Sequence, residues 1–177
     1  MTLHRPSNVD DNSQLDRVMT TVAELSHRLP VLFPIHPRTA ARIGQIPGLS
    51  AWLAKRSNLI CSSPLGYLDC VAASVQARLI LTDSGGLQEE STALGVPCLT
   101  LRKNTERPIT VEQGTSTLVG HNCARLRELF LSVLDGSYKR GACPELWDGR
   151  AAERIARHID YAIGGEAPSA PSFARAA

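Results

Sequence analysis

The sequence predicts an α/β protein with a doubly wound parallel sheet of the Rossmann-like type. Three observations support this: short apolar runs recur along the chain, helical patterns separate them, and the connections are short. Such alternation is typical of right-handed strand-helix-strand units with helices on both faces of the sheet. A length of 177 residues is sufficient for one domain with a core of its own.

Each element follows from a local pattern. Asp11-Asn12-Ser13 offers capping side chains ahead of apolar residues at helical spacing, and Gly95 with Pro97 ends a later helix. The predicted strands are 31–35, 58–61, 79–81, 98–101 and 116–119, and the predicted helices are 15–29, 39–46, 67–76, 87–94, 126–134 and 151–163. We therefore expect a domain over residues 1–163 and a disordered tail over 164–177, which has little to bury.

Composition excludes several classes of function. The net charge is only +2 and no basic run is present, so we expect no nucleic-acid binding. No stretch approaches the roughly 20 apolar residues of a membrane span, and no charged-then-apolar leader opens the sequence, so the expected location is cytoplasmic.

The five cysteines indicate neither a disulfide framework nor a zinc site. Their number is odd and their spacing is wide, with no C-x-x-C pair. Cys61 and Cys98 fall in apolar runs, which predicts small core residues. We expect no metal and no cofactor.

The segment after Leu79–Leu81 has the pattern of a phosphate site. Ser84, Gly85 and Gly86 stand between this apolar run and a helix, and glycines allow a sharp turn and a close approach of the backbone. The first N–H groups of a helix lack intrahelical partners and attract an anion. Glu90 follows one helical turn later, where it could accept hydrogen bonds from a sugar. The alternative is an ordinary tight strand-helix turn.

A wider set of motifs resembles the nucleotide-binding half of the non-hydrolysing UDP-N-acetylglucosamine 2-epimerases. The resemblance runs in register from Thr2 to about Ile163. Its motifs are Thr2-Leu3-His4-Arg5-Pro6-Ser7-Asn8, Pro34-Ile35-His36-Pro37-Arg38-Thr39, Pro64-Leu65-Gly66-Tyr67, Asp83-Ser84-Gly85-Gly86-Leu87-Gln88-Glu89-Glu90, Leu94-Gly95-Val96-Pro97, Thr105-Glu106-Arg107-Pro108 and Glu112-Gln113-Gly114-Thr115.

The resemblance implies one half of the two-domain GT-B architecture, in a chain about half the family's usual length. The family interconverts UDP-N-acetylglucosamine and UDP-N-acetylmannosamine by eliminating UDP to a glycal and adding it back. Its acidic catalytic residues usually lie in the other half, and no residue here is a convincing base for the C2 proton. The implied roles are His4 as the active-site histidine, Ser84, Gly85, Gly86 and Arg107 on the diphosphate, Arg5 beside them, Glu90 on the ribose, and Leu65 with Tyr67 at the uracil.

Some of these residues have simpler interpretations. Arg107 taken alone would be a surface arginine paired with Glu106 or Glu112, and His36 could end a strand and cap the next turn. Cys70 stands where the family usually has an aromatic residue. Because stacking on a base is worth roughly 1–3 kcal/mol, Cys70 predicts weaker nucleotide binding.

Met1-Thr2-Leu3 is too short for a central strand, although His4 should follow one. We favour a remnant or misassigned start over a separate polypeptide that supplies the rest. The expected partner is a UDP-sugar; alternatives to the epimerase are a non-catalytic UDP-sugar-binding module and a GT-B glycosyltransferase fragment. An apolar stripe of Leu146, Trp147, Ile155 and Ile159 predicts self-association, so a homo-oligomer is possible.

Overall fold

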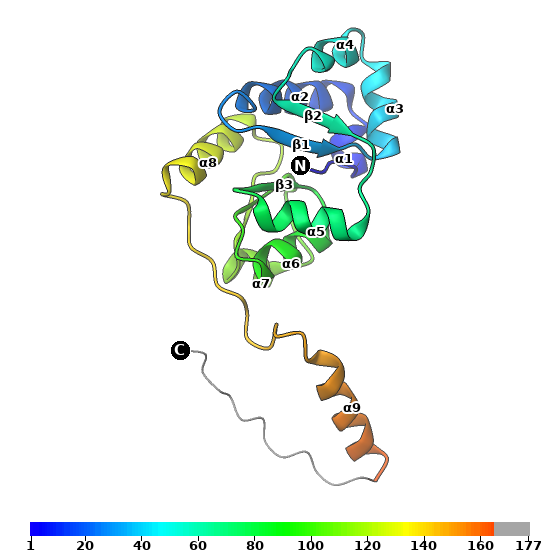
Figure 1. Cartoon of the computed structure of the whole chain (residues 1–177), viewed down its shortest axis with the longest axis vertical. Helices are drawn as coiled ribbons and strands as arrows, with labels where there is room; N and C mark the ends of the chain where they lie inside the picture. The colour runs from blue at the N-terminus through cyan, green and yellow to red at the C-terminus, as the bar shows by residue number, and fades with distance from the viewer. Residues whose placement is uncertain (165–177) are drawn as a thin grey trace. The chain divides into compact units, whose positions relative to one another are not determined.

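The computed structural model describes residues 1–164 and confirms a mixed α/β fold with parallel sheets (Figure 1). The strands are β1 (Val31–Pro34), β2 (Leu59–Ser62), β3 (Ile80–Thr82), β4 (Cys98–Thr100) and β5 (Ser116–Leu118). The helices are α1 (Pro6–Val9), α2 (Asn12–Leu25), α3 (Pro37–Gln45), α4 (Leu49–Ala54), α5 (Tyr67–Gln76), α6 (Gly85–Ala93), α7 (Pro108–Glu112), α8 (Cys123–Asp135) and α9 (Ala151–Ala162).

Two parallel sheets flank the first three residues of the chain. β1 pairs with β2, and β3, β4 and β5 pair in that order. The Met1 amino group donates to the Leu32 carbonyl (2.7 Å), and the Thr2 N–H donates to the Leu81 carbonyl (2.9 Å). Residues 1–3 therefore lie between β1 and β3 in the position of a strand, too short to complete a ladder with either.

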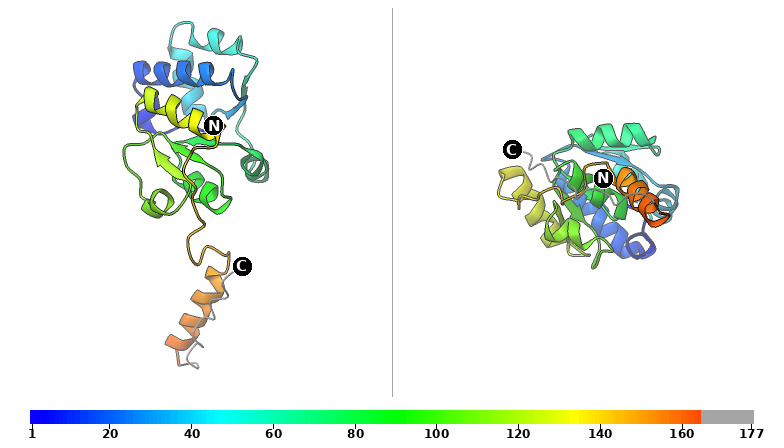
Figure 2. Two further views of the ribbon diagram at one scale, coloured as in Figure 1. Left: turned by 90° about the vertical axis from the view of Figure 1, so that its left-hand side faces the viewer. Right: turned by 90° about the horizontal axis from the view of Figure 1, so that it is seen from below.

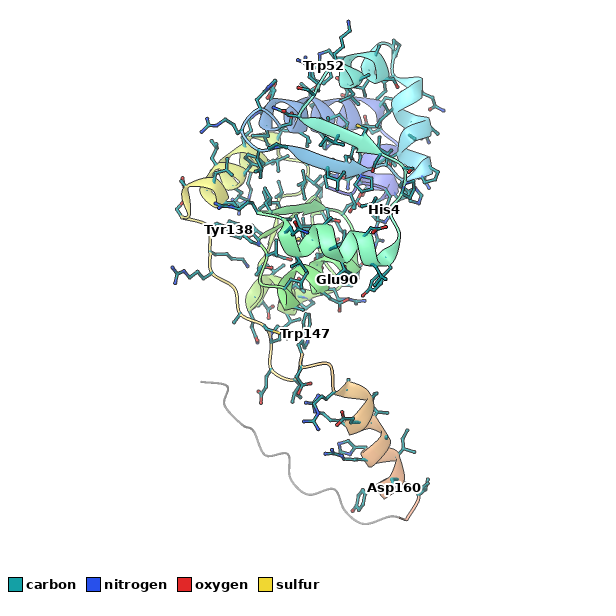
Figure 3. The ribbon with its side chains drawn as sticks, in the orientation of Figure 1. His4, Trp52, Glu90, Tyr138, Trp147 and Asp160 are labelled. Atoms are coloured by element: carbon teal, nitrogen blue, oxygen red, sulfur yellow. The ribbon has the colours of Figure 1, made fainter. Side chains whose placement is uncertain are left out.

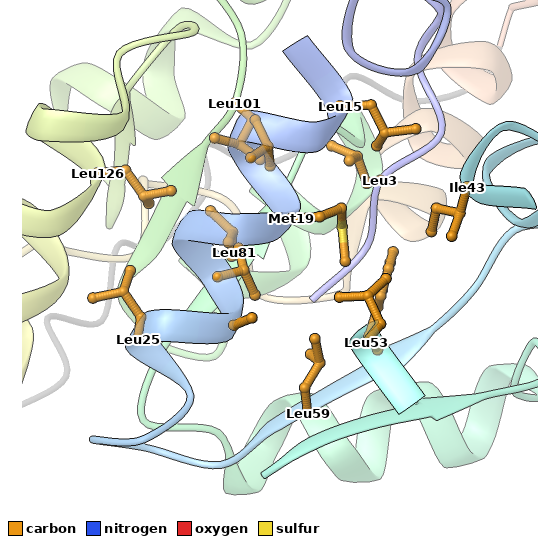
Figure 4. Close-up of a cluster of buried hydrophobic side chains, with 14 of the residues drawn as sticks. Leu3, Leu15, Met19, Leu25, Ile43, Leu53, Leu59, Leu81, Leu101 and Leu126 are labelled. Carbon is orange, nitrogen blue, oxygen red and sulfur yellow. The ribbon is translucent and has the colours of Figure 1, made fainter. Parts of the chain in front are cut away.

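Helices cover both faces of this layer, as Figure 2 shows. On one face α2 and α8 bury the main apolar core, part of which is drawn in Figure 4. On the other face a smaller cluster of Ile80, Val96 and Cys98 packs with Ala77, next to the end of α5. In β3, Ile80 thus belongs to this smaller cluster and Leu81 to the main core, which is why both residues are apolar.

Local signals account for the helix ends. Asp11 caps α2, because its carboxylate accepts from the Gln14 N–H (3.0 Å). Asn122 caps α8 in the same way, through the Arg125 N–H. Gly136 ends α8 at φ +81°, a conformation that glycine adopts without steric cost.

The structure corrects several expectations. α6 begins at Gly85, so Gly85 and Gly86 form its first turn and neither has a positive φ; they do not make a sharp turn. α2 ends at Leu25, and the short helices α1, α4 and α7 were not predicted because four to six residues give too little periodicity. Cys98 is buried as expected, but Cys61 is exposed, because it lies on the edge strand β2.

By its internal contacts the chain divides after Cys143, and a second unit begins at Pro144. Its helix α9 buries none of its side chains; Ile155 and Ile159 are exposed on the helix, and Ile163 is exposed directly after it. All of the predicted tail except Gly164 lies outside the described residues. None of the helices α1–α9 combines the length and apolar character needed to cross a bilayer.

Tyr138 ties the segment after α8 to the sheet. Its hydroxyl donates to the Thr115 carbonyl (2.9 Å) and lies 2.7 Å from the Thr117 hydroxyl. Burial, more than any neighbouring charge, raises the pKa of Tyr138 from 10.0 to about 12. The unfolded chain therefore ionises this tyrosine first, so the stability that Tyr138 contributes is present below pH 10 and is lost as the pH rises to about 12.

Tyr138→Phe should lower the free energy of unfolding at pH 8 by about 1–2 kcal/mol, because buried acceptors lose their donor. It should also reduce the loss of stability between pH 10 and 12. Urea unfolding across that range measures both effects, with the half-exposed Tyr161→Phe as control. Equal pH slopes for Tyr138→Phe and the unchanged chain would contradict the assigned burial.

Candidate functional site

The candidate site lies where residues 1–3 and β3 end. In open parallel sheets, ligands bind outside the carboxyl ends of the strands. Here that edge carries His4 after the first segment, His36 after β1 and Asp83 after β3. Figure 3 shows His4 and, on α6, Glu90.

Asp83 holds this edge together. Its side chain is fully buried, and its carboxylate accepts from the His4 N–H (3.0 Å), the Arg5 N–H (2.8 Å) and the Asn8 side-chain amide (2.9 Å). His4 Nδ1 lies 3.1 Å from Asp83 Oδ1. The sequence alone assigns Asp83 no role, although a carboxylate placed directly after a buried strand is a signal that can be recognised in it.

His4 is thereby oriented by its backbone and its ring. Because Nδ1 faces Asp83, the other ring nitrogen, Nε2, remains for a ligand. The His4 side chain is 35% exposed, so a ligand could reach it. The rings of His4 and His36 lie 5.5 Å apart, and His36 Nδ1 accepts from the Arg38 N–H (3.2 Å) at the start of α3. The interpretation of His36 as a strand-end cap therefore matches the geometry.

The start of α6 is open. Ser84 occupies the cap position, and within the described residues its side chain makes no capping bond to α6. A Cβ added at Gly85 would meet nothing within 4 Å, and one at Gly86 only the Ser84 hydroxyl, at 3.9 Å. Larger side chains at positions 85 and 86 would therefore fit without a clash with the described residues. The missing side chains instead leave the first N–H groups of α6 accessible to an anion.

A polar relay joins α6 to the loop that carries Arg107. The buried Gln88 side chain donates to the Ser84 carbonyl (3.1 Å) and accepts from the Thr105 hydroxyl (2.7 Å). The same hydroxyl accepts from the Arg107 N–H (3.0 Å). This relay places the Arg107 backbone beside the start of α6, and Gln88 was not singled out from the sequence.

Charge pairing differs from the sequence-based alternatives. Arg107 pairs with Glu89 of α6 (Nε–Oε1, 2.9 Å), whereas the sequence suggests Glu106 or Glu112 as its partner. Glu106 instead accepts two hydrogen bonds from the Arg102 guanidinium. This bidentate pair lowers the pKa of Glu106 to about 2, and the charge of Arg5 makes a smaller contribution. The Arg5 Nε is buried and has no hydrogen-bond partner among the described residues.

The other predicted residues lie on different elements. Glu90 is partly buried on α6, next to the paired Glu89. Tyr67 begins α5 and is 71% exposed, while Leu65 and Cys70 line a cavity that Leu87 of α6 also reaches. The structure therefore brings His4, Arg5, Ser84–Gly86 and Arg107 together around Asp83 and Gln88, and leaves Tyr67 at the surface.

Among residues 1–164, no group of three or more His, Cys, Asp or Glu side chains is arranged to hold a metal ion.

Comparison with known proteins identifies the family. The family described as UDP-N-acetylglucosamine 2-epimerase matches residues 1–160. The chain belongs to the UDP-N-acetylglucosamine 2-epimerase family. It is 39% identical over 163 residues to the UDP-N-acetylglucosamine 2-epimerase of Methanocaldococcus jannaschii, covering 91% of this chain and 44% of that protein. A putative UDP-N-acetylglucosamine 2-epimerase of Thermotoga maritima is 34% identical over 169 residues, covering 93% of this chain and 44% of that protein.

Solved epimerase structures have the same fold. The M. jannaschii epimerase in complex with UDP-GlcNAc and UDP matches with a TM-score of 0.79 and 38% identity, covering 90% of this chain and 44% of that one. The S. aureus MnaA-UDP structure matches with a TM-score of 0.77 and 28% identity, covering 97% of this chain and 47% of that one. This chain therefore spans less than half the length of the family members it matches.

Asp83→Asn should destabilise the fold by about 2–4 kcal/mol, because an amide presents an N–H₂ group to buried donors that now face a carboxylate. Urea unfolding measures the change. Asp10→Asn is the matched control: Asp10 is a surface carboxylate paired with Arg38 and Arg42, and its replacement should leave the unfolding midpoint nearly unchanged. Equal effects of the two variants would remove the central role given to Asp83.

Proposed function

We propose that this chain is the UDP-binding half of a UDP-N-acetylglucosamine 2-epimerase. The observation that carries the proposal is the open start of α6. Two residues flank it: Asp83 orients His4, and the hydrogen bonds of Gln88 and Thr105 position Arg107. The N–H groups at the start of α6 and the cationic side chains beside it can all bind the oxygens of one diphosphate. Family membership and the UDP-bound relatives support UDP as the ligand.

The proposed chemistry is loss of UDP from the sugar. The C2 proton leaves to a base, the C–H electrons form a C1=C2 double bond, and the C1–O bond breaks with its electrons on UDP. The N–H groups of Ser84, Gly85 and Gly86 and the side chains of Arg107 and Arg5 stabilise the charge that develops on the diphosphate. His4 Nε2 contacts the diphosphate from the opposite wall, and Glu90 accepts hydrogen bonds from the ribose.

Leu65 and Tyr67 are proposed as one wall of the uracil site. Tyr67 is exposed, so it is available to a base. Cys70 lines the cavity near Leu65 and cannot stack, which supports weak binding of the base.

Arg107→Ala should weaken UDP binding by about 1.5–3 kcal/mol, the range for hydrogen bonds to charged groups. Glu89→Gln should act in the opposite direction and strengthen binding about two- to five-fold, because it releases Arg107 and removes a carboxylate near the phosphates. Calorimetry with UDP measures both, with uridine as the ligand that lacks phosphate. Equal affinities for UDP and uridine would rule out the diphosphate site.

The activity is tested by joining the chain to a facing half. Alone it should not interconvert UDP-N-acetylglucosamine and UDP-N-acetylmannosamine, because no residue of this chain is a convincing base for the C2 proton. A chimera in which it replaces the matching segment of the M. jannaschii epimerase should turn over at about 1 s⁻¹ or faster, and His4→Asn should abolish that turnover. A folded chimera that binds UDP and stays inactive would instead favour the non-catalytic binding module.

A further inference from the structure

Arg107 is held both at its backbone and at its side chain. Its N–H donates to the Thr105 hydroxyl (3.0 Å), and its carbonyl accepts from the Thr110 N–H (3.0 Å) in the first turn of α7. Its Nη1 donates to the Glu106 carbonyl (3.3 Å), and its Nε lies 2.9 Å from the Glu89 carboxylate. The side chain is half-exposed, so these contacts set the direction in which Arg107 meets a ligand.

The side chain of Glu106 holds the peptide whose carbonyl Arg107 contacts. Both of its carboxylate oxygens accept from the Arg102 guanidinium (2.7 Å each). Arg102 is itself well anchored: its side chain is only 12% exposed, its N–H donates to the Thr100 carbonyl (2.8 Å), and its carbonyl accepts from the Gly120 N–H (3.1 Å). The loop between β4 and α7 is therefore tied, through Glu106, to the chain segments that follow β4 and β5.

We propose that Glu106, held by Arg102, is a positioning residue that directs the Arg107 guanidinium toward the diphosphate site at the start of α6. This inference rests on the proposed function, because it concerns the same ligand. Glu106 acts through its carbonyl on Arg107. A bidentate pair between arginine and a carboxylate suits this task, because it fixes an orientation as well as a distance.

Two carboxylates near Arg107 thus have opposite effects on the ligand. Glu89 pairs with the Arg107 guanidinium directly and competes with a phosphate for it. Glu106 directs its carboxylate to Arg102, and its carbonyl contacts Arg107. A carboxylate that acted by charge alone would repel a diphosphate from either position. The sign of the change in affinity therefore separates positioning from repulsion.

Calorimetry with UDP tests the positioning role in Glu106→Gln, in Arg107→Ala and in the double variant. The Glu106 side chain is half-exposed, so its replacement should leave the chain folded. Glu106→Gln should weaken UDP binding about five- to ten-fold, because the guanidinium is no longer held in place. In the Arg107→Ala background the same change should alter the affinity by less than about two-fold. Glu112→Gln, which removes an exposed carboxylate from α7, is the matched control and should leave the affinity nearly unchanged.

Arg102→Lys separates orientation from charge. Lysine keeps the net charge of the site but cannot make the bidentate contact, so UDP binding should weaken about three- to ten-fold. In NMR spectra Arg102→Lys and Glu106→Gln should both move the Arg107 Nε–H signal and speed the hydrogen exchange of the Arg107 amide, which donates to Thr105.

A gain in affinity on Glu106→Gln, like that expected for Glu89→Gln, would overturn the inference. So would an equal loss in the presence and absence of the Arg107 guanidinium. If Arg107→Ala weakens UDP binding while Glu106→Gln and Arg102→Lys leave it unchanged, the inference fails and the proposed function stands. If the unchanged chain does not bind UDP, the proposed function fails and the inference with it.

Discussion

The buried carboxylate of Asp83 is the interaction on which the site depends. At the end of β3 it accepts hydrogen bonds from two backbone N–H groups and the Asn8 side-chain amide, and it contacts the His4 ring. A buried carboxylate without such donors would be strongly unfavourable, so the chain segment after Leu3 has one well-defined path. That path sets the direction of His4 and the position of Arg5. The same aspartate directly precedes Ser84, so one residue links both walls of the proposed diphosphate site.

Much of the fold could be predicted from the sequence, because parallel strands and long helices leave strong patterns. α5 was predicted with its observed bounds, and β1 to β5 each lie within about a residue of expectation. The short helices α1, α4 and α7 were missed, since so few residues show no period. Cys61 was placed wrongly because an apolar run does not reveal that its strand lies at the edge of a sheet.

The site was predictable in its residues and less so in its contacts. His4, Ser84–Gly86 and Arg107 came from motifs, and the structure places them around one edge of the sheet. The roles of Asp83 and Gln88 depend on segments about 80 and 17 residues apart meeting in space, which local patterns do not encode. The glycines were assigned to a turn, whereas they form the open first turn of α6. Because these glycines have no side chains, a ligand can reach the start of the helix. Both have ordinary helical φ values, so the conformational freedom of glycine plays no part here.

An NMR titration of the chain with UDP would show whether a diphosphate binds between the start of α6 and His4. We expect the amide signals of Ser84, Gly85 and Gly86 to move together with the His4 ring signals, and inorganic pyrophosphate to shift the same set. Movement confined to other residues, with the α6 amides and the His4 ring unchanged at saturation, would contradict this expectation.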